Sequence, residues 1–386
     1  FGFSMGCGSS VQVPFEQQIH FTLVKTFKEG HKDQVNSIAV GGGTNGELFA
    51  TTSFDKSVHL WSATVGDQVN DLKGHTDSVD CCVFSPDGRY LATGSRDKTS
   101  ILWDTQSGLL VGIMEGHTAR VLWIAYASTG KLIASASEDK TIRLYNGLTA
   151  TFILPFVGHK QGVKQCVFSP KGDRLLSCSR DMTMRLWNTI TGACLVEFRG
   201  HTGIVNSCAF SHDGSKVISG SLDKTARVWN AESGAHMMTL KGHDQWIDWA
   251  FFSPDSKRAV TIAEDYSVRV WDPDNGREIG RLEGHDSYVE GFGFMEDGKH
   301  FITSAQDKSM RAWHLGTCKQ VGMFKFKTQI VAMKMKMEGG FIVCGDSEGT
   351  VYTLSAALPT LSSIEVAQEL KERERIAADM LSQLQG

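Results

Sequence analysis

The sequence predicts an all-β protein in which one unit of about 42 residues, holding four strands, repeats along most of the chain. A Gly-His pair recurs first, with its histidines 44 and then 42 residues apart. An aspartate series keeps step with it, and an aromatic residue follows each aspartate six positions later. In order, the residues are His31, His75, His117, His159, His201, His243 and His285; Asp55, Asp97, Asp139, Asp181, Asp223, Asp265 and Asp307; Trp61, Trp103, Tyr145, Trp187, Trp229, Trp271 and Trp313.

Each unit divides into four strands. Between Gly74 and Glu115, short apolar segments alternate with turn sequences such as the one from Ser85 to Gly88. The segments have strand length and leave no room for a helix. They cover residues 79–84, 90–94, 99–103 and 109–114. Because a single four-stranded sheet leaves both faces uncovered, the units are expected to stack around an axis.

A four-strand repeat with these Gly-His and Trp-Asp marks closely resembles the WD-repeat (WD40) family, whose fold is the β-propeller. The resemblance covers residues 20–356. It implies that each blade holds a hydrogen-bonded chain of the histidine, a serine two residues before the aspartate, the aspartate and the tryptophan. The implied sets are His31, Ser53, Asp55 and Trp61; His75, Ser95, Asp97 and Trp103; His159, Ser179, Asp181 and Trp187; His201, Ser221, Asp223 and Trp229.

Three blades depart from this pattern. Blade three has Tyr145 in place of the tryptophan, and blades six and seven have Ala263 and Ala305 in place of the serine. We expect these three blades to be less rigid than the others.

An eighth blade is predicted from the two ends of the repeat region. Three further strands follow Trp313, and Asp346 and Tyr352 stand six residues apart among them. These strands cover residues 329–337, 341–344 and 350–354. Residues 20–27 read as an outer strand without its own blade, so joining the two ends would close the ring and remove exposed sheet edges. The alternative is seven blades with the last segment packed outside.

Composition sets limits on the class of protein. The 386 residues carry a formal net charge of -4, which argues against a nucleic-acid partner. The nine cysteines include no C-x-x-C pair and lie partly in apolar runs, as free thiols do in a reducing compartment. No signal peptide and no apolar stretch of about 18 residues is visible. We therefore expect a cytoplasmic protein.

The repeated histidines and aspartates are interpreted as structural. An active site is made once per chain, whereas these pairs recur seven times. No H-E-x-x-H, G-x-S-x-G or phosphate-loop motif is present. We therefore expect a scaffold that binds other proteins, with no catalysis, cofactor or metal. A membrane-signalling module resembling G-protein β subunits and an enzyme on a propeller fold are the alternatives.

Binding is expected on one face of the ring. In propellers of this family, partners most often dock on the loops that enter the first strand and join the second to the third. The candidates on blades two to four are Asp80, Arg96, Arg120, Lys164 and Arg180, and those on blades six and seven are Trp246, Asp248, Glu264, Tyr288 and Glu290. One side of the mouth is thus mainly basic and the other acidic with two aromatic residues.

This split predicts a partner with a charged segment lying across the face, anchored by Trp246 and Tyr288. The alternative is that pairs such as Arg120 with Glu138 form only exposed salt bridges of little energy. Trp249 is three residues from Trp246 on the same predicted strand, so we expect it to point into the core.

Both ends of the chain carry further signals. Residues 1–19 are expected to form a flexible leader. If Met5 is the natural start, Gly6 begins an N-myristoylation pattern and Cys7 is well placed for palmitoylation. Two acyl chains would anchor the protein stably at a membrane. The alternative is a plain Gly/Ser-rich leader.

Residues 357–386 are predicted to form a linker and an amphipathic α-helix. Ser362 and Glu365 fit a capping box, and apolar residues follow at helical spacing. The stripe is Val366, Leu370, Ala377, Met380, Leu381 and Leu384. Packing on the propeller rim and packing on a partner helix both remain open.

Overall fold

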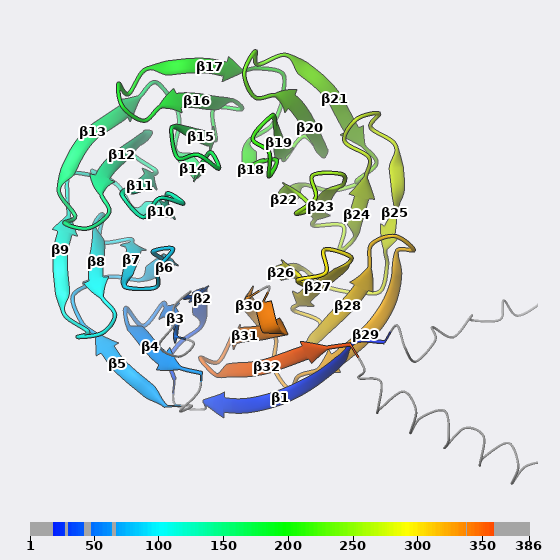
Figure 1. Cartoon of the computed structure of the whole chain (residues 1–386), viewed down its shortest axis with the longest axis horizontal. Coiled ribbons are helices and arrows are strands. Elements are labelled where there is room, and N and C mark those ends of the chain that lie inside the picture. Colours follow the sequence, from blue (N-terminus) through cyan, green and yellow to red (C-terminus); the bar gives the residue numbers. More distant parts are fainter. Residues whose placement is uncertain (1–17, 28–29, 42–47, 64–66, 337, 359–386) are drawn as a thin grey trace, which may run out of the picture.

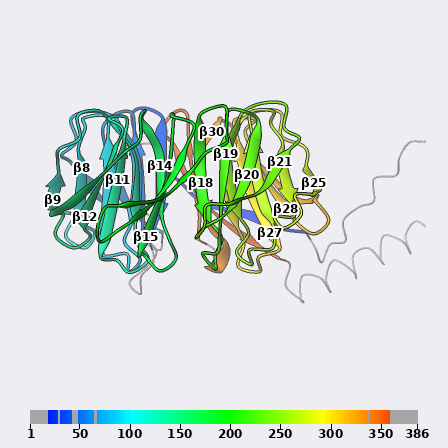
Figure 2. The same cartoon turned by 90° about the horizontal axis from the view of Figure 1, so that it is seen from above.

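The protein is a ring of eight blades. A computed structural model describes residues 18–27, 30–41, 48–63, 67–336 and 338–358. Within these ranges, 32 strands form eight antiparallel four-stranded sheets, arranged as blades around a central opening (Figure 1). Figure 2 shows the ring from its side. The predicted all-β, eight-bladed propeller is confirmed, and the seven-bladed alternative is wrong.

Every blade runs outward from the axis through four strands. The innermost strands are β2 (Val35–Val40), β6 (Val79–Phe84), β10 (Val121–Tyr126), β14 (Val163–Phe168), β18 (Val205–Phe210), β22 (Ile247–Phe252), β26 (Val289–Phe294) and β30 (Ile330–Met335). The second strands are β3 (Leu48–Ser53), β7 (Tyr90–Ser95), β11 (Leu132–Ser137), β15 (Arg174–Ser179), β19 (Lys216–Ser221), β23 (Ala259–Ala263), β27 (His300–Ala305) and β31 (Phe341–Asp346).

The outer half of each blade completes the sheet. The third strands are β4 (Val58–Ser62), β8 (Ser100–Asp104), β12 (Thr141–Asn146), β16 (Met184–Asn188), β20 (Thr225–Asn230), β24 (Val268–Trp271), β28 (Ser309–His314) and β32 (Val351–Ala357). The outermost are β5 (Gln68–Leu72), β9 (Leu110–Met114), β13 (Phe152–Val157), β17 (Cys194–Phe198), β21 (His236–Lys241), β25 (Glu278–Leu282), β29 (Lys319–Lys325) and β1 (His20–Phe27). One 3-10 turn, η2 (Glu338–Gly340), precedes β31.

The core lies between neighbouring blades. Clusters of buried side chains join successive sheets, as where Trp103 of blade two packs with Ala39 and Leu60 of blade one. Small residues allow the close approach: a Cβ on Gly94 would lie 2.8 Å from a methyl carbon of Val121 in the next blade. Burial of apolar surface between sheets is therefore what holds each blade in the ring.

The two ends of the repeat region close the ring. β1 pairs antiparallel with β32, from His20 opposite Ala357 to Phe27 opposite Val351. Phe27 is 8% exposed and packs with its ring 4.8 Å from that of Trp61 in blade one. The predicted eighth blade is confirmed, because the sheet order is β1-β32-β31-β30.

The hydrogen-bonded chain inside each blade uses a different hydroxyl from the one implied by the resemblance. His75 contacts Asp97 through Nδ1 and Thr93 through Nε2, both at 2.8 Å, and Trp103 donates to Thr93 at 3.0 Å. Thr93 stands four residues before the aspartate, not two. Ser95 instead donates to backbone carbonyls of the loop before β6 and accepts the N–H of Asp97.

This correction changes the expectation for blades six and seven. Thr261 and Thr303 supply the hydroxyl there, so Ala263 and Ala305 leave the chain of hydrogen bonds intact. The reason given for their lower rigidity is therefore wrong. In blade three the substitution does matter, because Tyr145 donates to the backbone carbonyl of Glu115 at 3.2 Å.

Blade eight follows another pattern. Ile330 pairs with Asp346 as Val79 pairs with Ser95 in blade two, so Asp346 occupies the serine position. The separation of six between Asp346 and Tyr352 therefore does not mark an Asp-Trp pair; Leu354 stands where the tryptophan would be. Asp346 is fully buried and accepts hydrogen bonds from Tyr352 and from the backbone of Thr350.

The predicted C-terminal helix and the acylation sites Gly6 and Cys7 lie outside the described residues. No helix in the described part of the chain has the length and apolar character needed to cross a membrane.

Candidate protein-binding face

One face of the ring is built by the loops that the sequence singled out. The backbone ties the two loops of a blade together at this face. Glu264 donates its N–H to the carbonyl of Trp246 at 2.9 Å, and Gln306 donates to Tyr288 at the same distance. All ten predicted residues belong to these loops or to the second residue of an innermost strand. We call this surface the mouth.

A pocket of about 520 Å³ opens on the mouth. It brings together five of the predicted residues, from blades four, six and seven: Lys164, Asp248, Glu264, Tyr288 and Glu290. Leu122, Trp123, Gln165, Asn206, Trp249, Val289 and Gln306 complete its lining. Trp246 is not part of this pocket, and neither are Asp80, Arg96, Arg120 and Arg180.

Two of the three carboxylates of this pocket, which we call the acidic pocket, accept hydrogen bonds from neutral side chains. Asp248 accepts a hydrogen bond from Asn206 at 3.2 Å, and Glu290 accepts one from Gln306 at 2.7 Å. No ion pair to any of the three is found among the described residues. Burial, together with the charges of Glu264 and Glu290, raises the pKa of Asp248 to about 7. Burial also raises the pKa of Glu290.

Aromatic side chains flank the carboxylates. Trp246 and Tyr288 are 45% and 40% exposed, and the ring of Tyr288 meets that of Tyr266 edge to face with centroids 5.2 Å apart. Sequence reasoning missed Tyr266. Its signal is visible, since it follows an aspartate of the repeat at a turn position that is lysine in most other blades, such as Lys224.

The inner wall of the acidic pocket is also aromatic. Trp249 lies half-buried there, with its ring centroid 5.8 Å from that of Trp123 and 5.4 Å from that of Phe292. Trp249 also packs against the buried apolar cluster of blades six and seven, so the expectation that it contributes to the core holds in part, while the same side chain lines the pocket. A β-bulge between Ile247 and Trp249 breaks the simple alternation of faces along β22.

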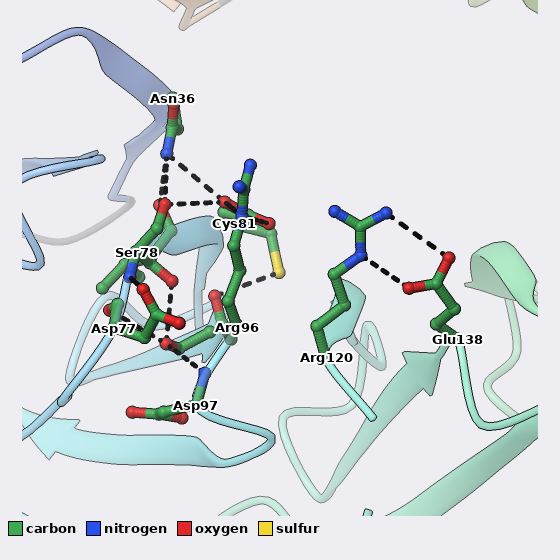
Figure 3. A network of polar contacts seen from close by, with 12 residues as sticks. Asn36, Asp77, Ser78, Cys81, Arg96, Asp97, Arg120 and Glu138 are labelled. Atoms are coloured by element: carbon green, nitrogen blue, oxygen red, sulfur yellow. Dashed lines mark hydrogen bonds and ion pairs between the residues drawn. The ribbon is translucent and has the colours of Figure 1, made fainter. Parts of the chain in front are cut away.

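The basic side of the mouth is largely neutralised from within (Figure 3). Arg96 contacts both carboxylate oxygens of Asp80, at 2.9 and 3.1 Å. Arg120 pairs with Glu138 at 2.8 Å, and Arg180 reaches the same carboxylate at 3.3 Å. The alternative that Arg120 and Glu138 form a salt bridge is confirmed. The charge split across the mouth is thus uneven, because the three arginines of the basic side are paired, whereas Lys164 and the carboxylates of the acidic pocket form no ion pair within the described ranges.

Lys164 stands on the opposite wall of the acidic pocket. Burial and the nearby charge of Arg180 lower its pKa, while the charge of Asp248 opposes that shift. Below the mouth, a second cavity of about 380 Å³ continues along the central channel. The described residues contain no group of three or more His, Cys, Asp or Glu side chains arranged to hold a metal ion.

Comparison with known proteins identifies the repeat. The family described as WD domain, G-beta repeat matches residues 21–62, 66–104, 108–146, 150–188, 192–230 and 234–272, which together exceed half of the chain. The chain belongs to the WD40 family. WD40 propellers typically act as non-enzymatic scaffolds that bind other proteins. A second family, the TEP-1 C-terminal beta-propeller, matches residues 294–356.

Individual relatives add little beyond the fold. The chain is 36% identical over 67 residues to nuclear distribution protein PAC1 of Coccidioides posadasii (strain C735), which is 16% of this WD40 chain and 14% of the relative. The computationally designed Ika8 protein has a solved structure that matches 84% of this chain and 97% of its own, with a TM-score of 0.74 and 25% identity.

Proposed function

We propose that this WD40 protein is a non-enzymatic intracellular scaffold that binds partner proteins across the mouth. The histidines, aspartates and tryptophans of the repeat support this, because the blades use them for their own hydrogen bonds. The mouth carries residues that differ from blade to blade, including the acidic pocket and exposed aromatic residues, and these are available to contact a partner protein.

The observation that carries the proposal is the combination of exposed aromatic rings with unpaired charge. Trp246 and Tyr288 are large and exposed, and they lie beside carboxylates that form no ion pair with any residue that the structure describes. Aromatic residues dominate the energetics of protein interfaces, and charged pockets steer and orient partners. A partner segment lying across the mouth would therefore use both features together.

Affinity purification from native cells tests the proposal. We expect the double variant Trp246→Ala and Tyr288→Ala to lose the main partner by at least about tenfold, since each anchor is expected to contribute on the order of 1–2 kcal/mol. The matched control is Ile279→Ala, an exposed apolar residue on the rim of blade six. Equal recovery by the double variant and the control, with thermal stability unchanged in both, would show that the binding surface lies elsewhere.

We also propose that acylation at Gly6 and Cys7 holds the scaffold at a membrane. The support is the sequence pattern from Met5 to Ser10. Mass spectrometry of the protein from its native cell, with membrane fractionation of Gly6→Ala and Cys7→Ser variants, tests it. An unmodified Gly6 at the mature N-terminus would contradict this part of the proposal.

A further inference from the structure

We infer that the acidic pocket accepts one lysine or arginine side chain from an extended segment of the partner protein. This inference rests on the proposed function and names the chemistry of the partner. Two features of the pocket carry it: three carboxylates that form no ion pair within the described ranges, and an aromatic wall.

The carboxylates come from two adjacent blades and converge on one space. Asp248 and Glu290 hold the same position after the first residue of β22 and β26, and Glu264 enters from the loop after β23. Amide groups satisfy two of them without neutralising their charge. Because like charges held close together repel, a cation placed among them would be bound more strongly than at an ordinary surface carboxylate.

The aromatic wall favours an organic cation. Trp123, Trp249 and Tyr288 line the same pocket as the carboxylates. The faces of tryptophan and tyrosine attract ammonium and guanidinium groups, and their apolar surface covers the methylene stem of lysine or arginine. A long basic side chain matches both the charged and the apolar parts of this lining.

Gln165 offers the pocket a hydrogen-bonding group for a peptide backbone. The residue is 7% exposed and lines the pocket, and its Oε1 accepts the backbone N–H of Cys208 at 2.8 Å. Its Nε2 donates to no group in the described part of the chain. This donor is therefore available to a carbonyl oxygen of a peptide that enters the pocket.

Lys164 limits the pocket to one cation. It lines the wall across from the carboxylates without forming an ion pair within the described ranges. A second basic group would meet its charge, so the entering side chain is confined to the side formed by blades six and seven. The residues of the segment next to its lysine or arginine are therefore expected to be neutral or acidic.

Fluorescence anisotropy with the full chain tests the inference. The probes are labelled, end-capped peptides Gly-Ser-Ala-X-Ala-Ser-Gly, with X as lysine, arginine, norleucine or glutamate. We expect the lysine and arginine peptides to bind at least about tenfold more tightly than the norleucine peptide. Glu264→Gln should weaken only the basic peptides, by about tenfold, whereas the control Glu296→Gln, an exposed carboxylate at the other end of β26, should change nothing.

The pH dependence provides a second readout. A cation that binds to ionised Asp248 should bind about tenfold more tightly at pH 8 than at pH 6, because the pKa of about 7 means that this carboxyl must first lose its proton. The lysine side chain stays charged throughout this range. Asp248→Asn should remove the pH dependence.

Two results would overturn the inference. One is equal affinity for the lysine and norleucine peptides, and the other is no measurable binding of the lysine peptide at millimolar concentration. Neither result would touch the proposed function if the Trp246→Ala and Tyr288→Ala variant still lost its partner, so the two failures are distinguishable.

Discussion

Nδ1 of His75 lies 2.8 Å from a carboxylate oxygen of Asp97, while Nε2 of the same ring lies 2.8 Å from the hydroxyl of Thr93. Trp103 donates to that hydroxyl as well. The histidine thereby links the loop before β6 to the second strand of its blade and to the turn that follows it. Such a buried and fully satisfied network stabilises one arrangement of the strands over others.

This hydrogen-bonded network, which we call the relay, predicts which hydroxyl contributes most to the stability of the blade. Thr93→Val leaves His75 and Trp103 with unsatisfied buried nitrogens, so we expect a loss of about 2–3 kcal/mol in the free energy of unfolding. Ser95→Ala removes a hydroxyl that contacts the backbone only and should cost about 1 kcal/mol. Urea denaturation measures both. A larger loss in the free energy of unfolding for Ser95→Ala than for Thr93→Val would show that the serine, and not the threonine, is the essential hydroxyl.

The relay aspartates predict acid sensitivity. Burial alone would raise the pKa of Asp307, but hydrogen bonds from His285 and Ser309 outweigh it and lower the pKa to about 2. A carboxyl whose pKa is lowered by folding stabilises the protein above its unfolded pKa, near 4, and loses that contribution as the pH falls toward 2.

We therefore expect Asp307→Asn to be about 2 kcal/mol less stable than the unchanged protein at pH 7, with the difference shrinking by pH 3. Denaturation curves at pH 7, 4 and 3 check this. A difference that stays constant over this range would show that the carboxylate contributes packing rather than charge.

Asp248 should behave in the opposite way. Its pKa is raised to about 7, by burial first and by Glu264 and Glu290 next. Folding therefore destabilises the ionised form, and stability falls as the pH rises from about 4 through 7. At pH 8, Asp248→Asn should raise the free energy of unfolding by on the order of 1 kcal/mol and so raise the melting temperature, whereas at pH 4 it should change little. Thermal melts of the variant and the unchanged protein at both pH values measure this difference. A variant that is less stable than the unchanged protein at pH 8 would contradict the prediction.

Ring closure can be tested at Phe27. This side chain packs against Phe49 and Trp61 of blade one while its strand completes blade eight. Phe27→Ala should cost about 3–4 kcal/mol through the cavity it leaves and should expose blade eight to proteases first. Limited proteolysis with mass spectrometry locates the early cuts. The exposed Leu23 on the same strand is the control, since Leu23→Ala should change neither stability nor cleavage. Early cuts spread evenly over all blades would argue against a weak point at the closure.

The sequence was sufficient for the architecture because the repeat marks are local. The turn residues, the Gly-His pairs and the aspartates lie within one blade, so counting them predicted seven blades. The strands after Trp313, joined to the strand at residues 20–27, predicted the eighth blade and the closure. The relay hydroxyl was misassigned because Thr93 and Ser95 are both polar, lie two residues apart and point to the same face of β7. Only the distances tell them apart.

The candidate site was predicted residue by residue but not as a pocket. Repeat register placed Asp248, Glu264 and Glu290 on one side of the mouth. It could not show that amides satisfy Asp248 and Glu290 while Asp80 and Glu138 neutralise the arginines of the basic side. Those pairings depend on which side chains touch one another, and the spacing of the repeat does not determine this. In blade eight, the position of Asp346 within the repeat was misassigned because no Gly-His pair marks that repeat.

The pairing of His20 with Ala357 has a mechanical consequence. A pull on these two residues loads the β1-β32 ladder at one end, so its hydrogen bonds break one after another rather than all at once. Tension applied through the chain would therefore separate β1 from β32 at modest force. Blade eight would come apart while the other seven sheets remain folded.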